Sequence, residues 1–265
     1  MSLSLDGKTA LITGGSRGIG RAIAERLAAD GAAIVINYAR SERLAQEVVK
    51  AISAKGGKAI GIQAGVSKPA EVRRLFSEAD KAMGGLDIVV ANAGVHIEKP
   101  LIENTEADYD YIFDTNTRGV FFTLQEAGRR VREGGRIVVV STGGTKMHFA
   151  NMSLYLGSKG AIEQFARSLS RELGPRNVTV NVLSPGFTET DMLPEEYPIT
   201  ARACRPSIAS ALRKISPRWL YFSLVMLPAG SPDRTCKRVV EWCEKTLSRA
   251  RLFQTTRLWR KDDAI

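Results

Sequence analysis

The sequence lacks several features that would place a protein in a membrane or outside the cell. Its 265 residues contain no apolar run approaching the roughly 20 residues that a membrane-spanning helix needs. The first residues do not show the basic and then apolar pattern of a secretory signal peptide, so we expect a cytoplasmic protein with no membrane partner. The three cysteines, Cys204, Cys236 and Cys243, show no metal-binding or redox spacing, which favours free thiols and no metal site.

Acidic residues are in deficit, because 38 Lys and Arg stand against 28 Asp and Glu, for a net charge of +10. The excess is uneven: residues 195–265 hold 14 basic and 7 acidic residues, all three tryptophans and one of the 24 glycines. A large positive charge can indicate a nucleic-acid-binding protein, but this segment lacks the regular basic and aromatic pattern of such a surface. We therefore expect no nucleic-acid partner, and we infer that residues 1–194 and 195–265 have different origins.

Residues 8–183 alternate short β-branched runs with longer helical patterns. Apolar strands separated by helices indicate a parallel sheet covered on both faces. The predicted strands are 9–13, 33–38, 58–63, 87–91, 136–141 and 179–183, and the predicted helices are 18–29, 41–55, 69–83, 105–131 and 153–173. We expect an α/β fold with a doubly wound parallel sheet (a Rossmann fold), in which ligands bind beyond the carboxyl ends of the strands. Residues 1–194 form this single domain, and residues 195–265 form an atypical C-terminal tail.

The first predicted strand leads into a glycine-rich turn and then a helix. Gly14, Gly18 and Gly20 let the backbone turn sharply, approach a pyrophosphate and pack the helix against the strand. The helix N-terminus presents free N–H groups and a positive dipole end to the phosphate. A glycine cluster is often only a tight turn, but its position between strand and helix makes it specific. The turn therefore predicts a dinucleotide site.

The end of the second predicted strand indicates which dinucleotide binds. A site for NAD places an Asp or Glu there to hold the ribose 2′-hydroxyl, whereas this chain has Tyr38, Arg40 and Ser41 and no carboxylate. Arg17 and Arg40 are suited to clamp a 2′-phosphate. The alternative is that both arginines are solvated surface residues. NADP(H) is the favoured cofactor.

Further candidates lie at the ends of later strands. Asn92-Ala93-Gly94 and Pro185-Gly186 each form a small-residue turn that permits a close approach to a cofactor. Ser141 ends an apolar strand, so its hydroxyl emerges at the ligand edge, although many strands end in serine because a turn begins there. Asn116 lies within a predicted helix, where Asn is a mediocre helix former, and capping or exposure to solvent is the alternative reading.

Tyr155 and Lys159 lie four residues apart at the head of the last predicted helix, so their side chains share one face. A free tyrosine has a pKa of about 10 and is a poor acid–base catalyst at neutral pH. We expect the ammonium of Lys159 to lower the pKa of Tyr155 and prepare it for proton transfer. The pair alone is weak evidence, because this spacing occurs on many ordinary helices.

Together these motifs resemble the short-chain dehydrogenase/reductase family over residues 3–194, and most closely its NADPH-dependent ketoreductases, which include β-ketoacyl carrier-protein reductases and polyketide or naphthol reductases. The resemblance implies that Tyr155 donates a proton to a carbonyl oxygen and that Lys159 holds the nicotinamide ribose. It also implies that Ser141 hydrogen-bonds the substrate oxygen, and that Asn116 supports a proton-relaying water chain. Gly65 stands where the family usually carries an Asp that contacts adenine. The catalytic residues implied are Asn116, Ser141, Tyr155 and Lys159, and the cofactor-binding residues implied are Gly14, Ser16, Arg17, Gly18, Ile19, Gly20, Tyr38, Arg40, Ser41, Val66, Asn92, Ala93, Gly94, Tyr155, Lys159, Pro185, Gly186, Thr188 and Thr190.

The tail departs from this family. The family's closing strand, which reads approximately Trp-Val-Thr-Gly-Gln-Asn, is not visible in residues 195–265. Codons for residues 230–242 can nevertheless be chosen so that, read one base earlier, they encode Trp-Val-Thr-Gly-Gln-Asn-Val-Gln-Ala-Cys-Gly-Gly-Val. Our hypothesis is that residues from about 195 onward are a frame-shifted reading of an ordinary family C-terminus. The alternative is a lineage-specific tail with its own partner.

The sequence thus predicts an oxidoreductase that transfers hydride from NADPH to a ketone, either a 3-oxoacyl compound or a cyclic or polyketide-type carbonyl. The alternative is a dinucleotide-binding sensor or scaffold with impaired catalysis. Members of this family commonly form dimers and tetramers. We expect a homodimer through helices 105–131 and 153–173, whereas the altered tail makes a tetramer doubtful.

Overall fold

Six parallel strands form one sheet in the part of the chain that the computed structural model describes, residues 4–186. The strands are β1 (Thr9–Ile12), β2 (Ala33–Tyr38), β3 (Ala59–Gln63), β4 (Leu86–Ala91), β5 (Val131–Val140) and β6 (Thr179–Leu183). Their order in the sheet is β3-β2-β1-β4-β5-β6, and every neighbouring pair is parallel. The chain therefore reverses its direction of travel across the sheet between β1 and β4, and a crevice at such a switch point is where doubly wound folds bind ligands. The predicted doubly wound fold is confirmed.

Helices flank the sheet because each presents one apolar stripe to it. They are α1 (Gly18–Ala29), α2 (Glu42–Ser53), α3 (Pro69–Met83), α4 (Glu106–Phe113), α5 (Gly119–Arg130) and α6 (Ser153–Glu172). Short helical turns lie at Leu101–Glu103, Gly143–Lys146 and Gly174–Arg176, and a π-helical turn lies at Asp114–Arg118. Within residues 4–186, no helix combines the length and the hydrophobicity needed to cross a bilayer.

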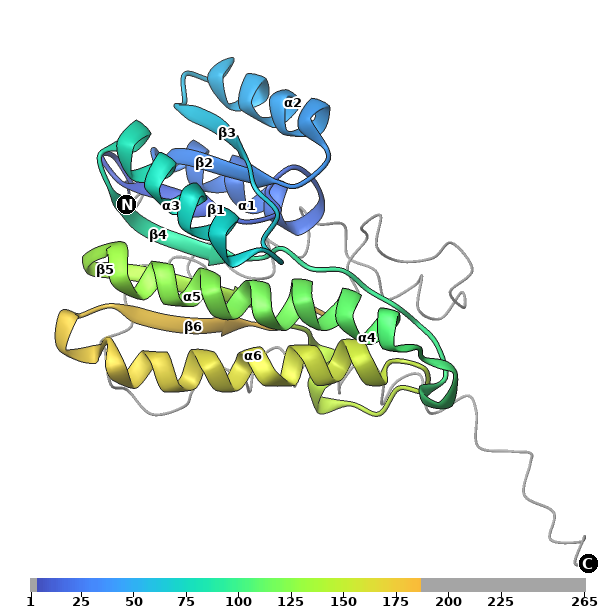
Figure 1. Ribbon diagram of the computed structural model, residues 1–265. Coiled ribbons are helices and arrows are strands. Elements are labelled where there is room, and N and C mark those ends of the chain that lie inside the picture. The colour runs from blue at the N-terminus through green and yellow to red at the C-terminus, as the bar shows by residue number, and fades with distance from the viewer. Residues whose placement is uncertain (1–3, 187–265) are drawn as a thin grey trace, which may run out of the picture.

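Alternate residues of each strand enter two separate cores. On β1, Leu11 packs into the core beneath α3, α5 and α6, whereas Ile12 packs with residues of α1 and α2. Figure 1 shows α3, α5 and α6 side by side in front of the sheet. Strands that are buried on both faces must be apolar throughout, which is why the strand runs in the sequence do not alternate with polar residues.

Two elements differ from the sequence prediction by more than two residues. The helix predicted over 105–131 is interrupted, because α4 ends at Phe113, a π-helical turn follows, and α5 begins at Gly119. The strand predicted from 136 begins at Val131, which pairs with Leu86 ahead of a register shift in the ladder. Apolar periodicity reveals neither the local π-type hydrogen bond nor the pairing of Val131 with Leu86.

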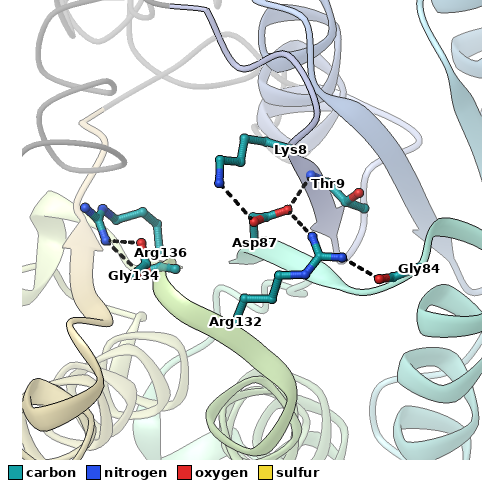
Figure 2. Close-up of polar contacts among 8 residues, drawn as sticks. Lys8, Thr9, Gly84, Asp87, Arg132, Gly134 and Arg136 are labelled. Atoms are coloured by element: carbon teal, nitrogen blue, oxygen red, sulfur yellow. Dashed lines mark hydrogen bonds and ion pairs between the residues drawn. The ribbon is translucent and has the colours of Figure 1, made fainter.

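Buried charges at the amino ends of the strands are paired. The carboxylate of Asp87, at the start of β4, accepts from the backbone N–H of Thr9 (2.9 Å) and from the guanidinium of Arg132 (2.9 Å). It also forms an ion pair with Lys8 at 3.3 Å, and Arg132 donates to the carbonyl of Gly84 (Figure 2). This buried carboxylate is fully partnered, and its contacts join the amino ends of β1, β4 and β5. Arg17 and Arg40, at the carboxyl ends of the strands, form no such ion pair within residues 4–186.

Candidate active site

A cavity of about 820 Å³ lies at the carboxyl ends of the strands. All six strands contribute to it, because the residues that follow or end them line its wall: Gly14, Tyr38, Val66, Asn92, Ser141 and Pro185. This is the size of a small-molecule site, and it lies where the fold is expected to bind a ligand.

Most of the residues predicted from the sequence meet in this cavity. Those that line it are Gly14, Ser16, Arg17, Gly18, Ile19, Tyr38, Arg40, Ser41, Val66, Asn92, Ala93, Gly94, Ser141, Tyr155, Lys159, Pro185 and Gly186. Gly20 and Asn116 are buried behind the wall instead of lining it. Thr188 and Thr190 lie outside the described residues.

The glycine-rich turn has the geometry expected of a phosphate cradle. Gly14 (φ +62°) and Gly18 (φ +54°) occupy the left-handed region that favours glycine. A Cβ on Gly20 would lie 2.4 Å from the carbonyl oxygen of Gly14, so no side chain fits there. Arg17 precedes α1 without capping it, and the first turn of the helix holds no acidic residue. The N–H groups of that turn therefore have no side-chain cap to compete with an anion.

Side chains from neighbouring strands fix this turn. The amide nitrogen of Asn92 donates to the carbonyls of Thr13 (2.9 Å) and Gly14 (3.1 Å), and the hydroxyl of Thr13 accepts from the N–H groups of Asn92 and Ala93. Asn37, which is buried on β2, accepts from the N–H of Gly14 at 3.3 Å. Asn92 thus shapes the cradle through its side chain as well as lining the cavity.

Arg17 and Arg40 are exposed at one end of the cavity. Within residues 4–186, neither guanidinium forms an ion pair, unlike Lys8 and Arg132 at the opposite edge of the sheet. The end of β2 carries Asn37 and Tyr38 with no carboxylate, in agreement with the sequence prediction. This end of the cavity is therefore positively charged and can receive a phosphate.

Asn116 lies in the π-helical turn between α4 and α5. The N–H of Gly119 bonds to the carbonyl of Asp114, five residues back, which is the π-type bond. The side chain of Asn116 is fully buried. It accepts from the N–H of Val95 (2.8 Å) and donates to the carbonyl of Val95 (2.8 Å) and to the hydroxyl of Ser158 (3.1 Å). Asn116 therefore ties the segment after β4 to α6, next to Lys159.

Lys159 is a buried cation whose ammonium donates to the carbonyl of Val140 at 2.9 Å. Burial lowers the pKa of Lys159 from 10.5 to about 8, because a charged ammonium is poorly solvated there. A Cβ placed on Gly94 would lie 3.3 Å from the Lys159 nitrogen. The glycine at position 94 thus leaves room for the lysine head.

Tyr155 does not show the lowered pKa expected from its lysine neighbour. Burial raises the pKa of the phenol, and a hydrogen bond with the side chain of Thr142 works in the opposite direction. The Lys159 nitrogen lies 5.9 Å from the centre of the Tyr155 ring, and the ammonium donates its hydrogen bond to the carbonyl of Val140. Desolvation of the phenol therefore outweighs the hydrogen bond with Thr142 in this arrangement.

Ser141 has a hydrogen-bond partner within the protein that the sequence did not predict. Its hydroxyl is buried and donates to a carboxylate oxygen of Glu163 at 2.8 Å. Glu163 lies on α6, four residues after Lys159, and no prediction from the sequence singled it out. The spacing of four was the available signal, because it placed Tyr155, Lys159 and Glu163 on one side of a single helix.

Comparison with known proteins identifies the family. The family model described as short chain dehydrogenase matches residues 8–198. The chain belongs to the short-chain dehydrogenase family. The resemblance drawn from the motifs is thereby confirmed, and the protein is an oxidoreductase of this family.

Several relatives of this short-chain dehydrogenase cover most of its length. A hydroxynaphthalene reductase-like protein from Metarhizium brunneum is 50% identical over 190 residues, which are 71% of each chain. A short chain dehydrogenase from Burkholderia cenocepacia, solved in complex with NADP, is 40% identical with a TM-score of 0.76, covering 84% of this chain and 92% of its own. A blue fluorescent protein from a metagenomic library, solved in complex with NADPH, is 36% identical with a TM-score of 0.78, covering 84% and 93%.

This dehydrogenase has one more feature that the motifs did not indicate, an apolar and aromatic wall around Tyr155. The ring of His96 lies edge-on to the ring of Tyr155, with centroids 4.7 Å apart. Burial lowers the pKa of His96, which favours the neutral imidazole. The further residues of this wall are Tyr111, Met147, Phe149, Met152 and Leu156. Nothing in the spacing of these residues marks them in the sequence.

Proposed function

We propose that this chain is an NADPH-dependent ketone reductase in which Tyr155 is the proton donor. The single observation that carries the proposal is one cavity with a cationic, glycine-lined end and an opposite end that holds Tyr155, Lys159 and Ser141. The solved relatives in complex with NADP and NADPH support the choice of cofactor.

The described residues fit NADP(H). The glycine turn and the uncapped start of α1 suit the pyrophosphate, and Arg17 and Arg40 suit a 2′-phosphate. Gly65 lines the same region without an adenine-contacting carboxylate. When bound, NADPH supplies a hydride to the carbonyl carbon of a substrate. Thr190 and the backbone near Phe187, which we expect to hold the carboxamide, lie outside the described residues.

Tyr155 moves the proton that reduction of a ketone requires. Because burial raises its pKa, the phenol is protonated at neutral pH and can give its proton to the carbonyl oxygen as that oxygen becomes an alcohol. The phenolate left on Tyr155 is then stabilised by the ammonium of Lys159, which is largely charged at neutral pH with a pKa of about 8. A phenol that rests in the protonated form favours reduction over oxidation. Asn116 holds the backbone around this pair and, on the family pattern, supports a water chain to Lys159.

The substrate is a ketone, and the wall around Tyr155 favours a flat cyclic or polyketide-type carbonyl over a 3-oxoacyl chain. Aromatic and methionine side chains provide broad apolar contacts for a ring. The similarity to hydroxynaphthalene reductase-like proteins supports the same class of substrate.

Measuring NADPH oxidation with a panel of cyclic ketones and 3-oxoacyl thioesters tests the proposal. Tyr155→Phe removes the transferable proton, so we expect turnover to fall by at least about a thousandfold while the Kd for NADPH stays within about twofold. Fluorescence titration gives the Kd. NADPH binding with no reduction of any ketone by the wild-type chain would instead indicate a sensor or scaffold, and a comparable loss of NADPH affinity in Tyr155→Phe would make the tyrosine structural.

We also propose that the chain forms a homodimer through α5 and α6. Phe121, 42% exposed on α5, contacts Phe122 of the same helix and Phe165 of α6 edge-on, and leaves an aromatic surface open on these two helices. A sedimentation mass of one chain at micromolar concentration would contradict this.

For residues 195–265 we propose the frame-shifted origin described above. The family match over residues 8–198 ends where the composition changes, which supports the proposal. Sequencing of the coding DNA tests it, and codons that yield no family motif in the shifted frame would contradict it.

A further inference from the structure

Glu163 is a buried carboxylate directly behind Ser141. Its side chain is only 5% exposed, and one of its oxygens accepts from two hydroxyls, Ser141 at 2.8 Å and Thr145 at 2.7 Å. Its other oxygen lies 3.6 Å from the Lys146 nitrogen and 3.5 Å from a nitrogen of Arg167. Carboxylates are rarely buried unless they are paired. Lys146 and Arg167 pair with the carboxylate on its outer side.

The hydrogen bond to Glu163 decides where the proton of Ser141 lies. A carboxylate without a proton can only accept, and a serine hydroxyl has a single proton to donate. The proton of Ser141 is therefore directed toward Glu163. The lone pairs of the Ser141 oxygen are left to face the cavity, which Ser141 lines and Glu163 does not.

We propose that Glu163 is a positioning residue that holds the Ser141 hydroxyl as a hydrogen-bond acceptor toward the cavity. The role rests on the proposed reductase function. In this orientation the oxygen of Ser141 can accept a hydrogen bond from a hydroxyl in the cavity, such as that of the alcohol product.

A kinetic double-mutant cycle tests whether Glu163 acts through Ser141. Glu163→Gln keeps the size of the side chain but replaces a charged acceptor with a weaker neutral one, so we expect kcat to fall about tenfold with an unchanged KM for NADPH. In the Ser141→Ala background, the same change should alter kcat by less than about twofold, because the group it acts through is gone. A tenfold effect in both backgrounds would overturn the proposal.

Glu126 provides a matched control. It is another buried carboxylate on a helix, α5, and it pairs with Arg129 and Arg130 outside the cavity. Glu126→Gln should change thermal stability and leave kcat within about twofold. If Glu126→Gln and Glu163→Gln lower kcat equally, the effect is one of general stability and the proposal fails.

A neutron crystal structure of the deuterated protein without cofactor tests the same claim independently of turnover. We expect the deuteron of Ser141 between its oxygen and Glu163, and a deuteron on the cavity side would overturn the proposal. If the wild-type chain reduces no ketone, the reductase function fails, and the neutron map still decides whether Glu163 sets the direction of Ser141.

Discussion

Replacing Lys159 with methionine should remove a characteristic dependence of stability on pH. In the native protein the pKa of Lys159 is about 8 because the ammonium is buried, whereas an exposed lysine in the unfolded chain keeps a pKa of 10.5. Between these two values the unfolded state binds more protons than the native state. The free energy of unfolding of the wild-type chain must therefore rise with pH over this interval, and the gain is lost as the pH falls through 8.

The size of the effect follows from the two pKa values. One pKa unit corresponds to about 1.4 kcal/mol, so the full difference between 10.5 and about 8 corresponds to about 3 kcal/mol. Integrated from pH 7 to pH 9.5, it should stabilise the wild-type chain by about 2 kcal/mol relative to Lys159→Met. The variant also loses the hydrogen bond to Val140, but that loss shifts its curve by a constant and leaves the slope unchanged.

Urea denaturation of both proteins at intervals of half a pH unit measures the difference. The matched control is Lys50→Met, which replaces an exposed lysine on α2 and should give a curve parallel to that of the wild-type chain. If the curve of Lys159→Met also runs parallel to the wild type from pH 7 to 9.5, Lys159 titrates as an exposed lysine does. The reasoning about its burial would then be refuted.

Two further changes probe the cofactor end of the cavity. Arg17→Ala combined with Arg40→Ala should reduce the preference for NADPH over NADH by about tenfold or more, because the guanidiniums that suit the 2′-phosphate are gone. The ratio of kcat/KM for the two cofactors measures this preference. Equal kcat/KM values for NADPH and NADH in the wild-type chain would contradict the prediction. Gly20→Ala should weaken NADPH binding and lower the free energy of unfolding by about 1–3 kcal/mol, because its Cβ would meet the carbonyl of Gly14 and the amide of Asn92. Calorimetric binding and urea denaturation measure the two effects, and a wild-type Kd in Gly20→Ala would show that the turn can relax.

The sequence was sufficient for the sheet and for the cofactor end of the site, for physical reasons. Strands buried on both faces have to be apolar, and a turn that admits a phosphate has to be rich in glycine, so both leave local patterns. The Tyr155 and Lys159 pair was visible because a helix fixes the direction of residues four apart. Gly94 was also visible as part of a small-residue turn, and the structure gives its reason, since a side chain there would contact the ammonium of Lys159.

What the sequence did not reveal depends on contacts between distant segments. The early start of β5 follows from the pairing of Val131 with Leu86. The partnership of Ser141 with Glu163 joins residues 22 apart, and the raised pKa of Tyr155 reflects burial that only the folded chain produces. Motif spacing predicts which residues meet, but not which of them donates a proton to which.

The number of residues in the π-helical turn between α4 and α5 sets the direction of the Asn116 side chain. Deleting one residue from 114–118 would let the backbone close into an uninterrupted α-helix, which is the more regular structure, yet Asn116 would turn away by about 100° from Val95 and Ser158. The helix would have an unbroken α-helical hydrogen-bond pattern, and the site would lose the hydrogen bonds of Asn116 next to Lys159. Insertions and deletions at this join are therefore under constraint from the chemistry and not from the helix that contains them.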